Sequence, residues 1–446
     1  MAGADRATIE SNSVLRAVTL CGLYFAQGLP YGFASIAVSA ALAKHGAAPE
    51  DIATLIATIL LPWTFKWAWG PLIDRFSLSA MGRRRPWILA AQSLMVLGVL
   101  AIAIGPDPME HKTWLMMSLL FVNIGCSLQD VSVDALAVDQ LSESERGRIN
   151  GFMWGSNYVG LAAGGAALGA IAAKADVRIA AMVLACCIAA VMLLPLLVCE
   201  RAGERRFPWS VGQATPHVLA QRTSVLLVLT RLVRAFALRS TIAAALFALL
   251  LNLQVGVLQS CSSVLMIQDL GWSQGAYSLW MGNIAFVGLA GSIVGGFAAD
   301  RLGARLVAAI AGIGVTICLA SFALLNAHWT NDTFVIGYMC VETFCAGMLS
   351  VACFSMFMTL SWPLVAATQF TAYMAMLNLS RLLGAALVPS IVPEDPTLAL
   401  WPQVWLWAAA LQAVPLGLLV LIDPRQTRRV LGGTDDDEEA TGHQLA

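Results

Sequence analysis

Five ionisable side chains lie inside long apolar runs of this 446-residue chain, where a buried charge is costly. Lys66 occurs in LPWTFKWAWGPLIDR, and Asp130 and Asp134 occur in SLQDVSVDALAVD. Glu342 and Arg381 occupy similar settings in the second half of the chain. Charges placed in this way either neutralise one another in ion pairs or bind protons and charged solutes.

The depth of each charge in its apolar run suggests its partner. Lys66 is expected to pair with Asp130 or Asp134, and Arg381 with Glu342. Asp130 and Asp134 lie one helical turn apart, and their mutual repulsion predicts that one of them holds a proton. The three acidic residues are therefore candidate proton-coupling sites, and the two cations are candidate substrate-binding groups. The alternative is that all five only form structural ion pairs.

Polar residues elsewhere in the apolar runs could line a central cavity with these charges. The candidates for substrate binding are Tyr24, Gln27, Gln129, Asn157 and Gln254. A single polar residue in an apolar helix commonly makes a hydrogen bond between helices, so packing stays open as the alternative for each. The indoles of Trp63, Trp67 and Trp69 border Lys66 and could flank a substrate.

A short Gly-Asp-Arg segment occurs twice, in GPLIDR and in GGFAADR, and each copy closes an apolar run. The copies lie about half the chain apart, since residue 300 minus residue 74 gives 226. Such a repeat, once per half, indicates a two-halved secondary transporter. The residues expected to form a conformational gate at the helix ends are Asp74, Arg75, Arg83, Asp139, Asp300 and Arg301.

The composition indicates a membrane protein rather than a soluble enzyme. Charged residues make up 12% of the chain, about half the usual share of a soluble domain, and the mean hydropathy is +0.75. No nucleophile–base or phosphate-binding motif stands out, and no cysteine or histidine spacing is that of a metal site. We expect no enzymatic activity, cofactor or metal. The expected partners are a small-molecule substrate, protons and the lipid bilayer, with no nucleic acid, and the chain is expected to be monomeric.

Apolar runs between polar breaks predict an all-α membrane protein with twelve spanning helices. The first six are expected at 17–42, 52–72, 86–105, 114–138, 149–172 and 178–199. The second six are expected at 240–266, 276–299, 304–326, 333–358, 366–391 and 402–422. An even number of spans places both termini on one side, and most of the 26 basic residues lie in the loops of that side. This asymmetry predicts cytoplasmic termini.

The same runs divide the chain into four parts. Residues 1–199 and 240–424 are each expected to form a six-helix bundle. The linker 200–239 is expected to be cytoplasmic, with an amphipathic helix on the membrane surface. Residues 425–446 are expected to be a disordered acidic tail. Small residues spaced by four in the fifth and eighth spans predict that these two helices approach closely.

Four segments carry a resemblance to a known family. The doubled Gly-Asp-Arg loop resembles the major facilitator superfamily. Within it, the chain resembles the AmpG-type muropeptide permeases in LYFAQGLPYGF, in LPWTFKWAWGPLIDRF followed by GRRRPWIL, in SLQDVSVDALAVD followed by ERGRINGF, and in ATQFTAYMAMLNLSR. The wider branch includes acetyl-CoA transporters and siderophore importers. The resemblance implies that the family's lysine maps to Lys66 and its acidic pair to Asp130 and Asp134.

The resemblance also implies a function. We expect a proton-coupled symporter that moves a bulky, anionic solute, such as an anhydromuropeptide, across the inner membrane by alternating access. Two alternatives stay open. One is an importer of a siderophore or acyl-CoA type solute, and the other is a non-transporting membrane assembly or sensor protein with the same fold.

Overall fold

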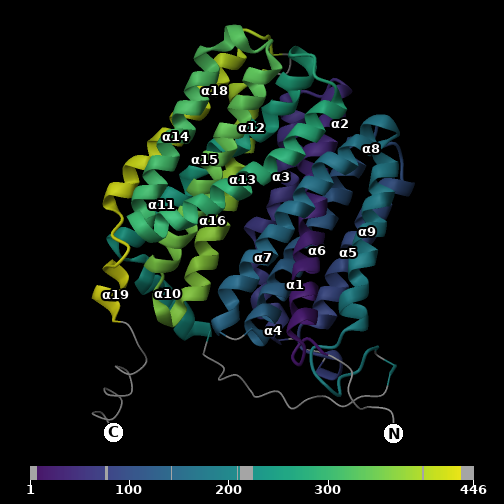
Figure 1. The fold of residues 1–446 in the computed structure, drawn as a ribbon, viewed down its shortest axis with the longest axis vertical. Coiled ribbons are helices and arrows are strands. Elements are labelled where there is room, and N and C mark those ends of the chain that lie inside the picture. Colours follow the sequence, from purple (N-terminus) through teal and green to yellow (C-terminus); the bar gives the residue numbers. More distant parts are fainter. Residues whose placement is uncertain are drawn as a thin grey trace. The chain divides into compact units, whose positions relative to one another are not determined.

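The computed structural model describes residues 8–75, 79–141, 143–207, 209–210, 225–393 and 396–432. Within these ranges, the side chains of residues 71, 74, 75, 79, 143, 144, 146–148, 150, 225–228, 363, 367 and 428 lie outside the described part. Every regular element in the described ranges is a helix, which confirms the expected all-α class. The helices of each compact unit run alongside one another (Figure 1).

In the described part of the chain, ten helical segments are long and apolar enough to cross a membrane. They are Ser13–Lys44, Arg85–Ile104, Lys112–Gln140, Gly151–Lys174, Val177–Leu197, Arg239–Asp269, Gln274–Leu302, Ala304–Leu324, Asp332–Leu360 and Trp401–Leu421. The two other expected spans, 52–72 and 366–391, are helical but interrupted. Twelve spans and cytoplasmic termini therefore stay predictions.

The chain packs into two compact units. Unit 1 comprises Met1–Val218 with Gln259–Phe286, and unit 2 comprises Leu219–Leu258 with Val287–Ala446. Residues 259–286 thus group with the first part of the chain, although they follow the linker in sequence. The expected division into two six-helix bundles stays a prediction.

The elements before the linker belong to unit 1. They are α1 (Ser13–Gly32), η1 (Phe33–Val38), α2 (Ser39–Lys44), α3 (Pro49–Thr64), η2 (Lys66–Ala68), α4 (Trp69–Arg75), η3 (Ser79–Met81), α5 (Arg85–Ile104), α6 (Lys112–Gln140), α7 (Glu143–Ala162), η4 (Ala163–Ala167), α8 (Leu168–Lys174) and α9 (Val177–Leu197).

The later elements begin with α10 (Val225–Phe236) and α11 (Arg239–Leu251). They continue with α12 (Leu253–Val264), η5 (Leu265–Asp269), α13 (Gln274–Leu302), α14 (Ala304–Leu324), η6 (Asn326–His328), α15 (Asp332–Leu360), η7 (Pro363–Val365), α16 (Ala366–Ala386), α17 (Val388–Ile391), α18 (Trp401–Leu416), η8 (Gly417–Leu421) and α19 (Gln426–Leu431). Residues 426–431 of the expected acidic tail are thus helical, and its acidic run lies outside the described residues.

Helices α1 and α7 pack with their backbones in close approach. A Cβ atom added at Gly160 would lie 2.3 Å from the Phe25 carbonyl oxygen, and one at Gly164 would lie 2.1 Å from that of Leu29. The partner helix shows the same constraint, because a Cβ at Gly28 would lie 2.2 Å from the Asn157 carbonyl oxygen. Glycine is required on both sides of this contact, which fixes the position of α1 in unit 1.

The opposite side of the fifth span meets the start of α13, also inside unit 1. A Cβ at Gly282 would lie 2.4 Å from the Ala166 backbone nitrogen, and one at Gly169 would lie 2.4 Å from the Ser278 Cβ. These contacts form the close approach of the fifth and eighth spans that the small residues predicted.

The second span is broken, although the sequence predicted one helix over 52–72. Helix α3 ends at Thr64, and Phe65 leaves helical geometry with φ −100° and ψ 10°. A single tighter turn, η2, then leads into α4. Pro62 lies inside α3, whereas Pro71 falls in the first turn of α4 and has no backbone N–H to donate to residue 67 of η2, so a continuous α-helix is not favoured there. The break places Lys66 at the end of a helix rather than within one.

Unit 2 repeats the backbone packing of unit 1. A Cβ at Gly256 would lie 2.0 Å from the Arg381 carbonyl oxygen, and one at Gly384 would lie 2.0 Å from that of Leu253. Helix α14 packs against α15 and α18, where Phe322 stacks on Tyr338 with ring centroids 4.0 Å apart. The indole of Trp405 donates to the Tyr338 hydroxyl at 2.9 Å.

The α1–α7 contact predicts a sharp difference between two glycines of one helix. Gly160→Ala forces a methyl group onto a backbone carbonyl and is expected to cost about 1–3 kcal/mol or more. Gly155→Ala meets no atom within 4 Å and is expected to be neutral or stabilising. The measurement is the thermal midpoint of purified protein. Equal midpoints for the two variants would contradict the close α1–α7 packing.

Candidate functional site

An ion pair links the broken second span to α6. The Lys66 Nζ atom lies 2.9 Å from the Asp130 Oδ2 atom, and both side chains are largely buried, with 16% and 11% exposure. The ammonium also lies 5.9 Å from the centroid of the Trp63 ring, within the range of a cation–π contact. Lys66 follows the end of α3, where unpaired carbonyl groups favour a cation. The sequence left the partner of Lys66 open, and the structure places Asp130 there.

Asp134 lies one turn further along α6 and has a different partner. Its Oδ1 atom accepts a short hydrogen bond from the Tyr24 hydroxyl of α1. Asp134 is accessible at the surface of unit 1, whereas Asp130 is 8% exposed and Tyr24 is 6% exposed. Two carboxylates and one ammonium thus share this site, so a net charge of −1 is left when both acids are ionised. A proton on one carboxylate would neutralise the site.

Tyr24 is held in place by two amide side chains from neighbouring helices. The Gln129 Nε2 atom of α6 donates to the Leu23 carbonyl oxygen at 2.8 Å. The Asn157 Nδ2 atom of α7 donates to the Tyr24 carbonyl oxygen at 3.2 Å. Both amides therefore make the helix–helix hydrogen bonds that were the alternative to a cavity role. Their effect is to fix the position of α1 beside Asp134.

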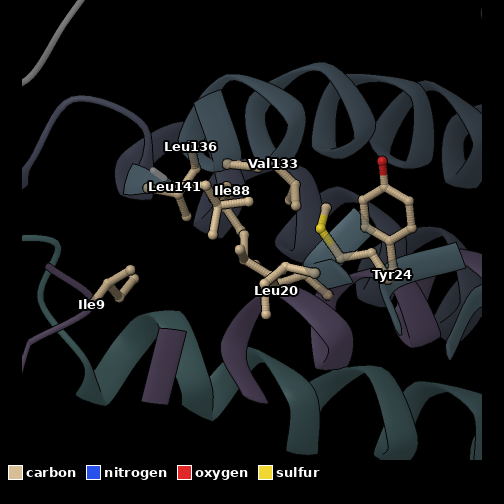
Figure 2. Packing of buried hydrophobic residues seen from close by; sticks show 11 residues of the cluster. Ile9, Leu20, Tyr24, Ile88, Val133, Leu136 and Leu141 are labelled. Atoms are coloured by element: carbon tan, nitrogen blue, oxygen red, sulfur yellow. The ribbon is translucent and has the colours of Figure 1, made fainter. Parts of the chain in front are cut away.

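An apolar cluster supports Tyr24 from the other side. It contains Leu20 of α1, Ile88 of α5, and Val133 and Leu136 of α6. Figure 2 shows Tyr24 at the edge of this cluster, with its hydroxyl oxygen directed away from the apolar side chains. The ring of Trp154 on α7 meets the Tyr24 ring edge to face, with centroids 5.9 Å apart. The phenol is thus fixed by packing and donates to a carboxylate.

The remaining candidates do not join this cluster of contacts. Gln27 is buried on α1 with 2% exposure, and Gln254 is buried on α12 with 3% exposure. In unit 2 the Glu342 carboxylate accepts a hydrogen bond from Thr343 at 3.3 Å and lies near the Cys318 thiol of α14. The expected pairing of Glu342 with Arg381 stays a prediction.

The structure describes the side chains of some of the expected gate residues but not of others. Asp139, at the end of α6, forms an ion pair with the Arg84 Nε atom at 3.0 Å. Asp300 and Arg301 are exposed in the last turn of α13. The side chains of Asp74 and Arg75 lie outside the described residues. A gating role for any of them stays a prediction.

Glu200 and Arg85 fasten helix ends in unit 1, and sequence reasoning missed both. The buried Glu200 carboxylate accepts from the backbone nitrogens of Arg83 at 3.1 Å, Arg84 at 2.7 Å and Arg85 at 2.5 Å. It therefore caps the start of α5. The Arg85 guanidinium, 1% exposed, donates to the carbonyl oxygens of Pro195 and Leu196 at the end of α9. The sequence signal that could have found Glu200 was its position at the start of a largely basic linker.

A second carboxyl supports this cap. The Glu204 Oε2 atom accepts from the Glu200 backbone nitrogen at 3.0 Å and from that of Arg201 at 3.2 Å. Burial and the neighbouring Glu200 carboxylate raise the pKa of the Glu204 carboxyl from its ordinary value of 4.5 to about 7. Across the described part of the chain, no group of three or more His, Cys, Asp or Glu residues is arranged to hold a metal ion.

Comparison with known proteins gives one family and one fold. A model of the Major Facilitator Superfamily matches residues 20–423. The anhydromuropeptide permease of Escherichia coli (strain K12) is 26% identical over 433 residues, which cover 92% of this chain and 80% of that protein.

Solved structures show the same fold. A D-xylose–proton symporter has a TM-score of 0.72 at 13% identity, with 93% of this chain and 98% of that one covered. The nucleoside transporter NupG has a TM-score of 0.69 at 14% identity, with 91% and 98% covered.

The Glu204 cap predicts a pH-dependent stability. Because its pKa is higher in the folded state, the protonated carboxyl stabilises the fold below pH 4.5, and this contribution is lost as the pH rises through about 7. Glu204→Gln keeps the acceptor oxygen without the charge. We expect it to be more stable than the wild type by about 1 kcal/mol at a pH of about 8, with little difference at about 5. Thermal midpoints across this range test it, with exposed Glu110→Gln as control. Parallel pH profiles for the wild type and Glu204→Gln would contradict the assignment.

Proposed function

Because this chain belongs to the Major Facilitator Superfamily, we propose that it is a proton-coupled symporter in which Asp134 binds the proton and Lys66 binds an anionic substrate. Membership makes the chain a multi-pass membrane transporter of small molecules and not an enzyme. The proposal adds the coupling ion, the residues and the substrate class.

The observation that carries the proposal is the arrangement of one ammonium and two carboxylates in apolar helices. Lys66 is engaged by Asp130, so Asp134 is the carboxylate outside the ion pair. It is accessible, and its partner is the neutral hydroxyl of Tyr24. A neutral donor tolerates both forms of an acid, because a hydroxyl can donate to a carboxylate or accept from a carboxylic acid. Asp134 is thus able to gain and lose a proton without losing its partner.

Coupling follows from competition for Lys66. An anionic group that draws the ammonium away leaves Asp130 and Asp134 unpaired one turn apart, with side chains about 6 Å from each other. Two such charges repel by about 3 kcal/mol at an effective dielectric constant near 20, several times the thermal energy. Substrate binding at Lys66 therefore favours proton binding at Asp134. Release of the substrate restores the ion pair and favours loss of the proton.

The substrate is proposed to be a bulky anionic solute such as an anhydromuropeptide. What supports this is the extended similarity to the anhydromuropeptide permease of Escherichia coli, together with the buried cation at Lys66. We place the protein in the inner membrane as a monomer with cytoplasmic termini, importing its substrate by alternating access. Uptake of a siderophore or of an acyl-CoA type solute would replace the proposed substrate. A non-transporting role would replace the proposed transport function.

The first test concerns the proton. Asp134→Asn keeps the acceptor for Tyr24 but removes the titrating group. It is expected to reduce gradient-driven uptake of an anhydromuropeptide into proteoliposomes at least tenfold while keeping substrate exchange without a gradient. Asp51→Asn, which alters an exposed ion pair with Lys112, is the control. Gradient-driven accumulation by Asp134→Asn at the wild-type level would rule out Asp134 as the proton site.

The second test concerns the cation. Lys66→Gln leaves Asp130 buried without its partner and is expected to lower stability by about 3–5 kcal/mol. The double variant Lys66→Gln/Asp130→Asn removes both charges, so it is expected to recover stability but not substrate affinity. Thermal midpoints and binding of the anhydromuropeptide are measured together. A double variant that binds the substrate like the wild type would exclude Lys66 as the anion-binding group.

A further inference from the structure

We propose that Trp63 and Trp69 are positioning residues that hold the Lys66 ammonium on Asp130, an inference that rests on the proposed function only in assigning Lys66 a role in transport. Along the second span one indole precedes Lys66 and the other follows it, and each donates a hydrogen bond to a residue of α6 on the N-terminal side of Asp130. The side chains of Trp63, Lys66 and Trp69 all donate to α6, and together they hold the broken second span against that helix.

Three donors of the second span meet three acceptors of α6. The Trp63 Nε1 atom donates to the Asn123 Oδ1 atom at 3.1 Å, and the Trp69 Nε1 atom donates to the Ser127 Oγ atom at 3.0 Å. The Lys66 ammonium donates to the next acidic group of α6 at 2.9 Å. Donors recur every three residues and acceptors every three or four, so each series follows one face of its segment.

The break in the second span explains why such donors are needed. Between Thr64 and Trp69 the backbone forms one tight turn, η2, so regular α-helical hydrogen bonds do not hold this segment straight. A slip of one residue in such a turn moves the chain by about 2 Å. Since the Lys66–Asp130 distance is 2.9 Å, that slip would break the ion pair. Indole bonds before and after Lys66 prevent it.

The acceptors on α6 are themselves oriented by their own helix. The Asn123 Nδ2 atom donates to the Leu119 carbonyl oxygen at 2.9 Å, and the Ser127 hydroxyl donates to that of Ile124 at 3.0 Å. Asn123 and Ser127 are buried, with 1% and 0% exposure. Each acceptor oxygen is thus fixed before the indole reaches it, as a positioning interaction requires.

The second half of the chain shows that packing alone does not require these indoles. The repeat offset of 226 residues maps Trp63, Lys66 and Trp69 to Leu289, Ser292 and Gly295. There α13 packs directly on α15: a Cβ at Gly295 would lie 2.6 Å from the Met348 Cα, and the Ser292 hydroxyl donates to the Gly347 carbonyl oxygen at 3.2 Å. In unit 2 small residues bring the same two spans together. The indoles occur in the copy that carries the charge.

The first measurement reads the position of Lys66 directly and does not depend on transport. Purified protein is treated with formaldehyde and a borohydride reductant, and methylation of each lysine is followed by mass spectrometry. Exposed Lys44 and Lys174 serve as internal references. Trp63→Phe and Trp69→Phe are each expected to raise the relative rate at Lys66 several-fold, and the double variant more. Trp114→Phe is the matched control, because it removes an indole bond to the Ala101 carbonyl oxygen far along α6. Wild-type rates at Lys66 in both single variants would overturn the proposal.

A second pair of variants tests the same proposal if the tryptophan variants fail to fold. Asn123→Leu and Ser127→Ala remove the acceptors and leave both indoles in place. They are expected to expose Lys66 to methylation in the same way. Protection of Lys66 in both would also overturn the proposal.

Transport then separates positioning from general packing. Trp63→Phe is expected to raise the KM for the anhydromuropeptide several-fold with little change in maximal rate. In a Lys66→Gln background it is expected to add nothing, because the residue acts through Lys66. An additive loss there would show a packing role and overturn the proposal. If Lys66→Gln itself transports normally while methylation still follows the indoles, the proposed function fails and the positioning role stands.

Discussion

The ion pair between Lys66 and Asp130 is the interaction on which the rest of unit 1 depends, because an ammonium in an apolar helix bundle is tolerated only beside a carboxylate. The pair ties the broken second span to α6. Asp134, one turn away, has the Tyr24 hydroxyl as its partner, and it is the acid to which we assign the proton. The surrounding helices hold Lys66, Asp130 and Asp134 in these relative positions.

Two kinds of packing fix the positions of these helices. Backbone contact through glycines sets α1 against α7 to within a few tenths of an ångström, because no side chain fits between Gly160 and the Phe25 carbonyl oxygen. Side-chain amides from Gln129 and Asn157 then fix the stretch of α1 that carries Tyr24. Gln129 and Asn157, which could have lined a cavity, instead donate to helix backbone. In an apolar environment this is the expected outcome, since a buried amide without a partner is costly.

The two halves of the chain share a repeat but not a chemistry. The spans that meet through Trp63, Lys66 and Trp69 in unit 1 meet through glycine and serine in unit 2. In unit 2 the acid of the fourth-span equivalent, Glu342, lies near the Cys318 thiol of α14 and accepts a hydrogen bond from the Thr343 hydroxyl at 3.3 Å. The contacts between these two spans therefore differ in kind between the two copies. The second half retains the helical frame and the repeated Gly-Asp-Arg segment.

By itself the sequence determined the all-α class, most helix positions and the charges to examine, because apolar run length and buried charge are local properties of the chain. It also limited the partner of Lys66 to Asp130 or Asp134, since a turn of helix separates them. Tertiary structure alone decided between the two and placed Arg84 beside Asp139. Those outcomes depend on how helices rotate and break. A helix break such as the one at Phe65, or a close contact at a glycine, changes which neighbour the following side chains meet. No local sequence pattern specifies the rotation that results.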